Sequence, residues 1–217
     1  MSELFDEVNE DVRRDQLKKL WDQYSIYIIA GALLIIAAVC GWRGYQYLEA
    51  KKAAEAGAAF DKAVELSEAN KHTEAEAAFA DLAAKGPAGY RILSRLRLAS
   101  EVANRDPVAA AKMFDDIAAD RSVGAPEQDL ARVRAAQLLL ETSTYPNMLQ
   151  RLEAATTPGS TFRHTARELL ALSAWRANDA TAARHWLDMI ANDGETPPSL
   201  RSRAEALQAL LPPVAKS

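Results

Sequence analysis

The sequence contains a single cysteine, Cys40, so no disulfide can form within the chain. This thiol lies in the most apolar segment, and cysteine usage therefore gives no information about the compartment. Aromatic residues make up only 7% of the chain, and no proline occurs before Pro87. Alanine is abundant instead, and a chain rich in alanine and poor in aromatic and β-branched residues favours helices over sheets.

An excess of charge of one sign is missing from most of the chain. Residues 1–22 hold seven acids and four bases and contribute −3 to the formal net charge of −4, which leaves −1 for the other 195 residues. A near-neutral domain lacks the attraction for phosphates on which general nucleic-acid binding depends. We therefore expect no nucleic-acid partner.

Patterns that carry catalysis or metal binding are also absent from the sequence. The three histidines, His72, His164 and His185, lie far apart and lack the spacing of metal ligands. The glycine-rich turn at 86–89 lacks the GK[ST] ending of a phosphate loop, and no nucleophile elbow or HExxH motif occurs. We expect no enzymatic activity, cofactor, metal or small-molecule substrate. An enzyme with an unrecognised site is the alternative from another functional class.

Charged residues are missing over the twenty positions 23–42, QYSIYIIAGALLIIAAVCGW. A helix of this length rises ~30 Å, which matches the hydrocarbon core of a bilayer. The segment predicts a single transmembrane helix, preceded by a short segment over 1–22. Aromatic residues that suit the two headgroup layers stand at its ends: Trp21 and Tyr24 before it, Trp42 and Tyr45 after it.

A buried core helix, a cleaved signal peptide and a lipoprotein signal are the alternatives for this segment. A core helix is rarely apolar all round over twenty residues, and the long acidic leader differs from the short basic start of a signal peptide. Val39 stands where a lipobox requires a small residue, so a retained anchor is the better interpretation. Charge does not choose its orientation, because basic residues balance across the span: Arg13, Arg14, Lys18 and Lys19 before it, and Arg43, Lys51, Lys52 and Lys62 after it.

Turn residues recur at regular intervals after residue 69 and separate helical stretches of roughly ten to eighteen residues. Large apolar residues repeat within these stretches with spacings of 35, 35 and 37, and a second set follows three positions later. A small residue four positions earlier, in most repeats, completes the pattern of the second helix of a tetratricopeptide-type (TPR) hairpin. The predicted packing positions are Ala75, Phe79 and Leu82; Ala110, Phe114 and Ile117; Leu149 and Leu152; and Ala182, Trp186 and Met189.

These patterns predict an all-α chain, in which a single N-terminal transmembrane helix is followed by a TPR-like solenoid of helical hairpins. The repeat domain is expected over 43–211, and residues 212–217 are expected to form a flexible tail. Repeat domains of this kind offer extended surfaces to other proteins, so protein partners are expected.

Basic residues also recur at the repeat spacing. Lys62, Arg97, Arg132 and Arg167 are 35 residues apart and Arg203 lies 36 further on, all on the predicted first helices of the hairpins. Such a ladder could grip acidic side chains or a terminal carboxylate of a partner. The alternative is that each base pairs locally, because acids recur at about the repeat spacing on the second helices. These acids are Asp81, Asp116 and Asp188, and Arg151 interrupts their series.

Four features follow one another along the chain: the leader SELFDEVNEDVRRDQLKKLWDQY, the span that follows it, the stretch YRILSRLRLA at 90–99 and the degenerate hairpins. Together they resemble the TPR-like ancillary subunits of the SecYEG translocon in their alphaproteobacterial form. The resemblance implies a bacterial inner-membrane protein with a cytoplasmic N-terminus and a periplasmic repeat domain. It implies that SecYEG, a membrane-anchored periplasmic chaperone and emerging polypeptides are the partners. It also implies that the chain has no catalytic residues. A TPR adaptor for cell-envelope assembly or cell division is the alternative.

Overall fold

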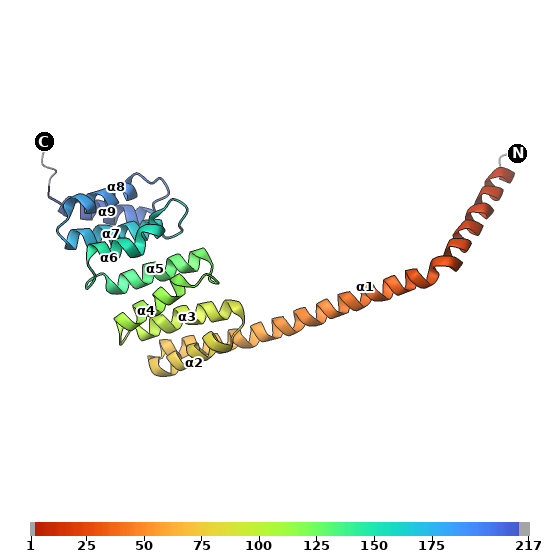
Figure 1. Ribbon diagram of the computed structural model, residues 1–217, viewed down its shortest axis with the longest axis horizontal. Helices are drawn as coiled ribbons and strands as arrows, with labels where there is room; N and C mark the ends of the chain where they lie inside the picture. The colour runs from red at the N-terminus through yellow and green to blue at the C-terminus, as the bar shows by residue number, and fades with distance from the viewer. Residues whose placement is uncertain (1–2, 213–217) are drawn as a thin grey trace. The chain divides into compact units, whose positions relative to one another are not determined.

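The computed structural model describes the backbone of residues 3–212 and the side chains of residues 18, 21–27 and 29–212. All regular structure in this part of the chain is helical (Figure 1), which confirms the predicted all-α class. The chain divides into two compact units, Met1–Glu55 and Ala56–Ser217, and the long first helix contributes to both. The helices are α1 Glu3–Glu68, α2 His72–Lys85, α3 Ala88–Val102, α4 Pro107–Ala119, α5 Ala125–Leu139, α6 Tyr145–Leu152, the 3₁₀ helix η1 Glu153–Thr156, α7 Arg163–Arg176, α8 Ala180–Ala191 and α9 Pro198–Leu210.

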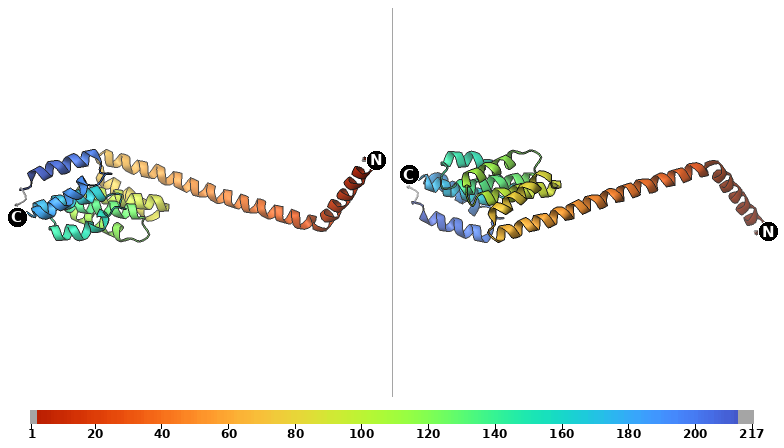
Figure 2. Two further views of the ribbon diagram at one scale, coloured as in Figure 1. Left: turned by 90° about the horizontal axis from the view of Figure 1, so that it is seen from above. Right: turned by 90° about the horizontal axis from the view of Figure 1, so that it is seen from below.

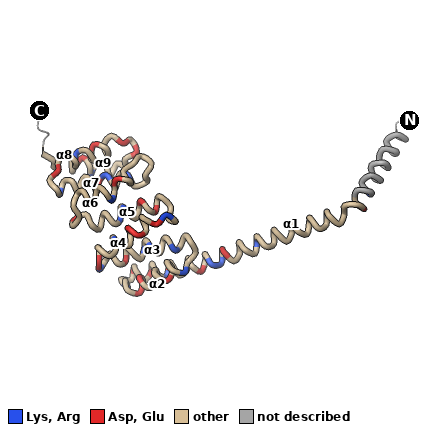
Figure 3. The backbone as a smooth tube through the Cα atoms, in the orientation of Figure 1, with Lys and Arg blue, Asp and Glu red and all other residues tan. Residues whose placement is uncertain are grey.

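The first unit ends at Glu55 and contains the apolar part of α1. Among the described residues, α1 is the one helix long and apolar enough to cross a membrane, and none of its most apolar stretch is buried. The side chains of Ile26, Leu34 and Trp42 project outward and are more than half exposed. A soluble core helix would cover such residues, so this surface suits contact with lipid. Charged residues are correspondingly sparse along this part of the backbone (Figure 3).

The aromatic residues predicted to mark the ends of the span are exposed as well. Trp21 and Tyr24 lie at its start. Trp42 and Tyr45 lie at its end, where their ring centroids are 6.4 Å apart. Indole and phenol rings have an apolar body and a polar tip, which suits the headgroup layer of a bilayer. Their position at membrane interfaces remains a prediction.

The second unit is a stack of helical hairpins. Its helices follow one another in chain order, each packed against its neighbours (Figure 1, with turned views in Figure 2). The turns between them have the expected chemistry. The carboxylates of Asp106 and Asp179 accept hydrogen bonds from backbone N–H groups in the first turns of α4 and α8, which satisfies donors that a helix leaves unpaired. Asn70 and Asn178 each adopt φ 58° two residues before a second helix, a conformation that asparagine tolerates better than most residues.

In the first, second and fourth hairpins, the second helix buries alanine at its fourth position and larger residues four and seven positions later. The third hairpin buries three residues at the equivalent positions, without this order of sizes. The buried sets are Ala75, Phe79 and Leu82; Ala110, Phe114 and Ile117; Met148, Leu152 and Ala155; and Ala183, Leu187 and Ile190. Met148 replaces the small residue in the third hairpin, where η1 continues the short α6. The steps between sets are 35, 38 and 35 residues. The first two sets coincide with the predicted packing positions.

The register of the third and fourth hairpins differs from the predicted one. The loop between α4 and α5 spans 120–124, whereas only 86–87 separate α2 from α3, and these three additional residues displace everything that follows. Leu149, Ala182 and Met189 are therefore only partly buried at the edge of the C-terminal core. Trp186 is 7% exposed, and its indole N–H donates a hydrogen bond to the hydroxyl of Tyr145 at 2.9 Å.

The stack ends with α9, which packs against α8 without a following second helix of its own in the described chain. On α9 itself, Leu200 and Ala204 are buried, whereas Ser202 and Glu205 are exposed. A terminal helix with a polar outer side closes the open end of a repeat array. The predicted flexible tail, 212–217, lies outside the described residues except for Pro212.

Candidate protein-binding site

A groove of about 390 Å³ runs along the first helices of the N-terminal hairpins. Its walls come from the end of α1, from α3 and from α5, and α4 contributes one residue. Aliphatic and aromatic side chains dominate the lining, and two arginines accompany them. The lining residues are Phe60, Leu93, Leu96, Arg97, Ser100, Phe114, Leu130 and Arg134.

Helical spacing explains why these side chains share one surface. The four residues of α3 stand at i, i+3, i+4 and i+7, and Leu130 and Arg134 of α5 stand at i and i+4. Residues at these intervals lie on the same side of a helix. The core uses a different side of α3, where Ser94, Ala99 and Val102 are buried. Within the stripe, Leu93 is 48% exposed, whereas Leu96 is partly buried against the core around Phe114.

The two arginines of the groove lack an acidic partner among residues 21–212. Arg97 is exposed and makes no ion pair there, and Arg134 donates only to the amide oxygen of Gln137 at 3.4 Å. Ser100 and the apolar lining residues add no negative charge. The groove therefore combines an apolar floor with an uncompensated positive charge.

Of the five basic residues in the predicted ladder, Arg97 alone is among the residues that line the groove. Lys62 lies two residues beyond the groove residue Phe60 on α1, and two residues along a helix point to nearly opposite sides. Arg132 pairs with Asp129 at 2.6 Å and donates to the carbonyl oxygen of Ala118. The ladder therefore does not form one continuous surface.

The remaining two members of the ladder are engaged with the protein itself. The side chain of Arg203 is 59% exposed and forms a bidentate pair with Glu168. Arg167 is 4% exposed, donates to the carbonyl oxygens of Thr156 and Met189, and pairs with Asp193 at 2.9 Å. The displaced register explains this burial. With repeat steps of 38 and then 35 residues, Arg132 and Arg167 correspond to the buried Ser94, which they follow by 38 and 73 residues. They do not correspond to the exposed Arg97.

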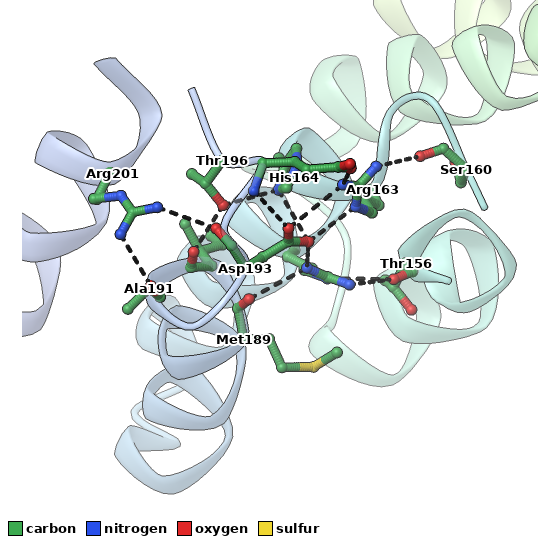
Figure 4. A network of polar contacts seen from close by, with 12 residues as sticks. Thr156, Ser160, Arg163, His164, Met189, Ala191, Asp193, Thr196 and Arg201 are labelled. Carbon is green, nitrogen blue, oxygen red and sulfur yellow. Dashed lines mark hydrogen bonds and ion pairs between the residues drawn. The ribbon is translucent and has the colours of Figure 1, made fainter. Parts of the chain in front are cut away.

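Asp193 is the centre of a polar network in the C-terminal part of the repeat unit (Figure 4). Its carboxylate accepts hydrogen bonds from Arg163 and Arg167, and the bonds from Arg163 hold the pKa of Asp193 well below its usual range. His164 is buried beside it and accepts or donates a hydrogen bond with the Thr196 hydroxyl at 3.1 Å. Burial lowers the pKa of His164, with the charge of Arg163 as the next cause. The network joins α7 to the loop after α8.

A second cluster surrounds the buried carboxylate of Glu101 on α3. Ser67 donates a hydrogen bond to it at 2.5 Å, and His72 lies 2.8 Å from its other oxygen. Serine and histidine thus both contact the carboxylate, whereas a catalytic triad requires contact between the serine and the histidine. Within the described residues, no group of three His, Cys, Asp or Glu side chains could hold a metal ion. Both polar clusters fasten helices together.

A family model described as a tetratricopeptide repeat-like domain matches residues 18–170, which is more than half of the chain. The chain belongs to the tetratricopeptide repeat-like domain family. The matched region begins before the apolar part of α1 and extends into α7. No curated protein and no solved structure matches the chain significantly. TPR-like repeat domains are typically non-enzymatic modules that bind other proteins.

The sequence interpretation missed most of this TPR-like groove. Leu93, Leu96, Leu130 and Arg134 were not among the predicted site residues. A signal was present, since the stretch from 90 to 99 contains more apolar residues than one buried helix side needs. Arg134 is not a member of the predicted ladder, because it is 37 residues from Arg97 and the ladder follows a 35-residue spacing.

Proposed function

We propose that this protein is a membrane-anchored, non-enzymatic scaffold whose TPR-like groove holds segments of other proteins near a translocation site. The observation that supports the proposal is the groove itself, in which the exposed Leu93 lies beside partly buried apolar side chains. Apolar surface that is rimmed by polar residues commonly marks an interaction site. The apolar helix in the same chain would keep this groove at the membrane.

Tethering accounts for how a weak binding site can act effectively. A groove of this size contacts only a few side chains, so we expect modest affinity for any one segment. Confining the groove to the membrane raises its effective concentration near a partner in the same membrane to the millimolar range for a short linkage. A weak site can then capture a chain as it emerges and release it again.

The translocon is the proposed neighbour because the leader, the span and the stretch at 90–99 resemble the ancillary SecYEG subunits. In this proposal residues 1–22 lie in the cytoplasm and the repeat unit lies in the periplasm of a bacterial cell. SecYEG, a membrane-anchored periplasmic chaperone and emerging polypeptides are the proposed partners. A role in cell-envelope assembly or cell division is the alternative function, and the experiment must distinguish it from a role at the translocon.

Site-specific photo-cross-linking in membranes tests this proposal. A photoreactive amino acid at Leu93 should cross-link to a translocon subunit, to the chaperone or to a chain in transit. The same amino acid at Glu205, which is exposed on the polar outer side of α9, serves as the control and should give little product. Cross-links from Leu93 to division or outer-membrane assembly factors would favour the rival role. Equal yields at the two positions would contradict a groove-binding scaffold.

A further inference from the structure

The apolar lining of the groove does not explain its two arginines. Arg97 on α3 and Arg134 on α5 line the same groove from neighbouring first helices. Arginine is a cationic side chain that suits the recognition of carboxylates. Both side chains are exposed, and a purely hydrophobic site would not require them.

Most of the other arginines of the repeat unit lie within 4.0 Å of a carboxylate. Arg97 and Arg134 have no such partner in the described part of the chain. Arg91, Arg121, Arg184 and Arg201 share this property, but only Arg97 and Arg134 line the groove. The compensated arginines are Arg95 with Asp120, Arg105 with Glu76, Arg132 with Asp129, Arg151 with Asp115, Arg163 and Arg167 with Asp193, Arg176 with Glu141, and Arg203 with Glu168.

We propose that the groove selects protein segments in which a carboxylate accompanies an apolar side chain. This inference rests on the proposed protein-binding function and names the chemistry of the ligand. The apolar side chain packs against Leu93, Leu96 and Leu130. The carboxylate accepts charge-assisted hydrogen bonds from the guanidinium of Arg97 or Arg134, for which a planar carboxylate has the matching geometry.

The same charges also exclude unsuitable segments. A lysine or arginine of the ligand in the groove would face two cations with no acid nearby, and like charges held close together oppose binding. A neutral segment would bury the apolar surface but leave the guanidinium groups uncompensated. We therefore expect acidic apolar segments to bind most tightly, neutral ones more weakly and basic ones least.

Fluorescence anisotropy with the full chain in detergent micelles tests this order. Three labelled twelve-residue peptides share the same leucine positions and carry glutamate, glutamine or lysine at the others. The glutamate peptide should bind at least ~tenfold more tightly than the glutamine peptide, because a charge-assisted pair is worth more than 1.4 kcal/mol. High salt should reduce this difference. A leucine-rich peptide with a free or an amidated C-terminus then distinguishes a chain end from an acidic side chain as the source of the carboxylate.

The double variant Arg97→Gln/Arg134→Gln should bind the glutamate and glutamine peptides equally. Arg91→Gln is the matched control, since Arg91 is exposed on the same helix but does not line the groove, and it should retain the full preference. Unchanged helicity of both variants shows that folding is not the cause. Equal affinity of the natural protein for the glutamate and glutamine peptides, or no binding of any peptide, would overturn the charge selection. Cross-linking from Leu93 decides the scaffold function separately.

Discussion

At the scale of single residues, Arg97 and Arg167 show how the same amino acid serves two purposes. Both belong to the basic series of the sequence, yet one is exposed in the groove and the other is 4% exposed within the Asp193 network. The guanidinium of Arg167 donates hydrogen bonds to backbone carbonyl oxygens of η1 and α8. Its removal would leave the carbonyl oxygens of Thr156 and Met189 without this donor and would leave Asp193 with Arg163 as its remaining ion-pair partner, which is costly in a protein interior.

Replacing Arg167 with alanine should lower the free energy of unfolding by about 3 kcal/mol, because it breaks a buried ion pair and its carbonyl contacts. Replacing Arg203 with alanine should cost about 0.5 kcal/mol or less, since its pair with Glu168 is half exposed to solvent. Denaturant titration of the repeat unit's helical signal in the full chain measures both. Similar costs for the two variants would contradict the structural role of Arg167.

The buried His164 makes stability depend on pH. Its pKa in the folded chain is lowered from the ordinary value near 6.5, so the unfolded chain binds a proton more readily than the folded one. The stabilisation is fully present above pH 6.5 and is lost as pH falls toward the lowered value. We expect a lower unfolding midpoint at pH 5.5 than at pH 7.5. His164→Gln should have a smaller difference between the two pH values, and an equal or larger difference would contradict this assignment.

At the scale of elements, the hairpins depend on local signals at the helix starts. Aspartates cap α4 and α8, and prolines stand in the first turns of α4, α5, α6 and α9. Proline lacks the N–H that a first turn cannot use, and aspartate satisfies N–H groups that the helix leaves free. These signals determine locally where the helices begin.

Replacing the cap residue Asp106 or Asp179 with alanine should lower the free energy of unfolding by about 1 kcal/mol each. Asp116→Ala is a suitable control, because Asp116 is exposed later in α4 and caps nothing. Thermal unfolding followed by circular dichroism in micelles compares the three variants. A cap variant as stable as Asp116→Ala would show that packing alone holds that hairpin.

At the scale of the whole molecule, membrane attachment would decide where the groove can work. The apolar part of α1 is long enough to cross a bilayer, and the basic residues on its two sides balance, so topology must be measured. A reporter that is active only outside the cytoplasm, fused after Ser217, should be active in the full chain. Deleting residues 1–42 should abolish that activity. An inactive reporter on the full, membrane-bound chain would place the repeats in the cytoplasm and contradict the translocon proposal.

The sequence alone was sufficient to predict the helices, the exposed apolar segment and the repeat architecture, because capping, turn chemistry and hydrophobic spacing act over a few residues. It also placed the packing sets of the first two hairpins, where Ala75 and Ala110 are 35 residues apart. Only the tertiary structure decided the later register and the roles of the arginines. Three additional residues between α4 and α5 move Arg132 and Arg167 inward and bring Arg134 beside Arg97. Which side chain meets a carboxylate depends on neighbouring helices, and a periodicity in one chain does not contain that information.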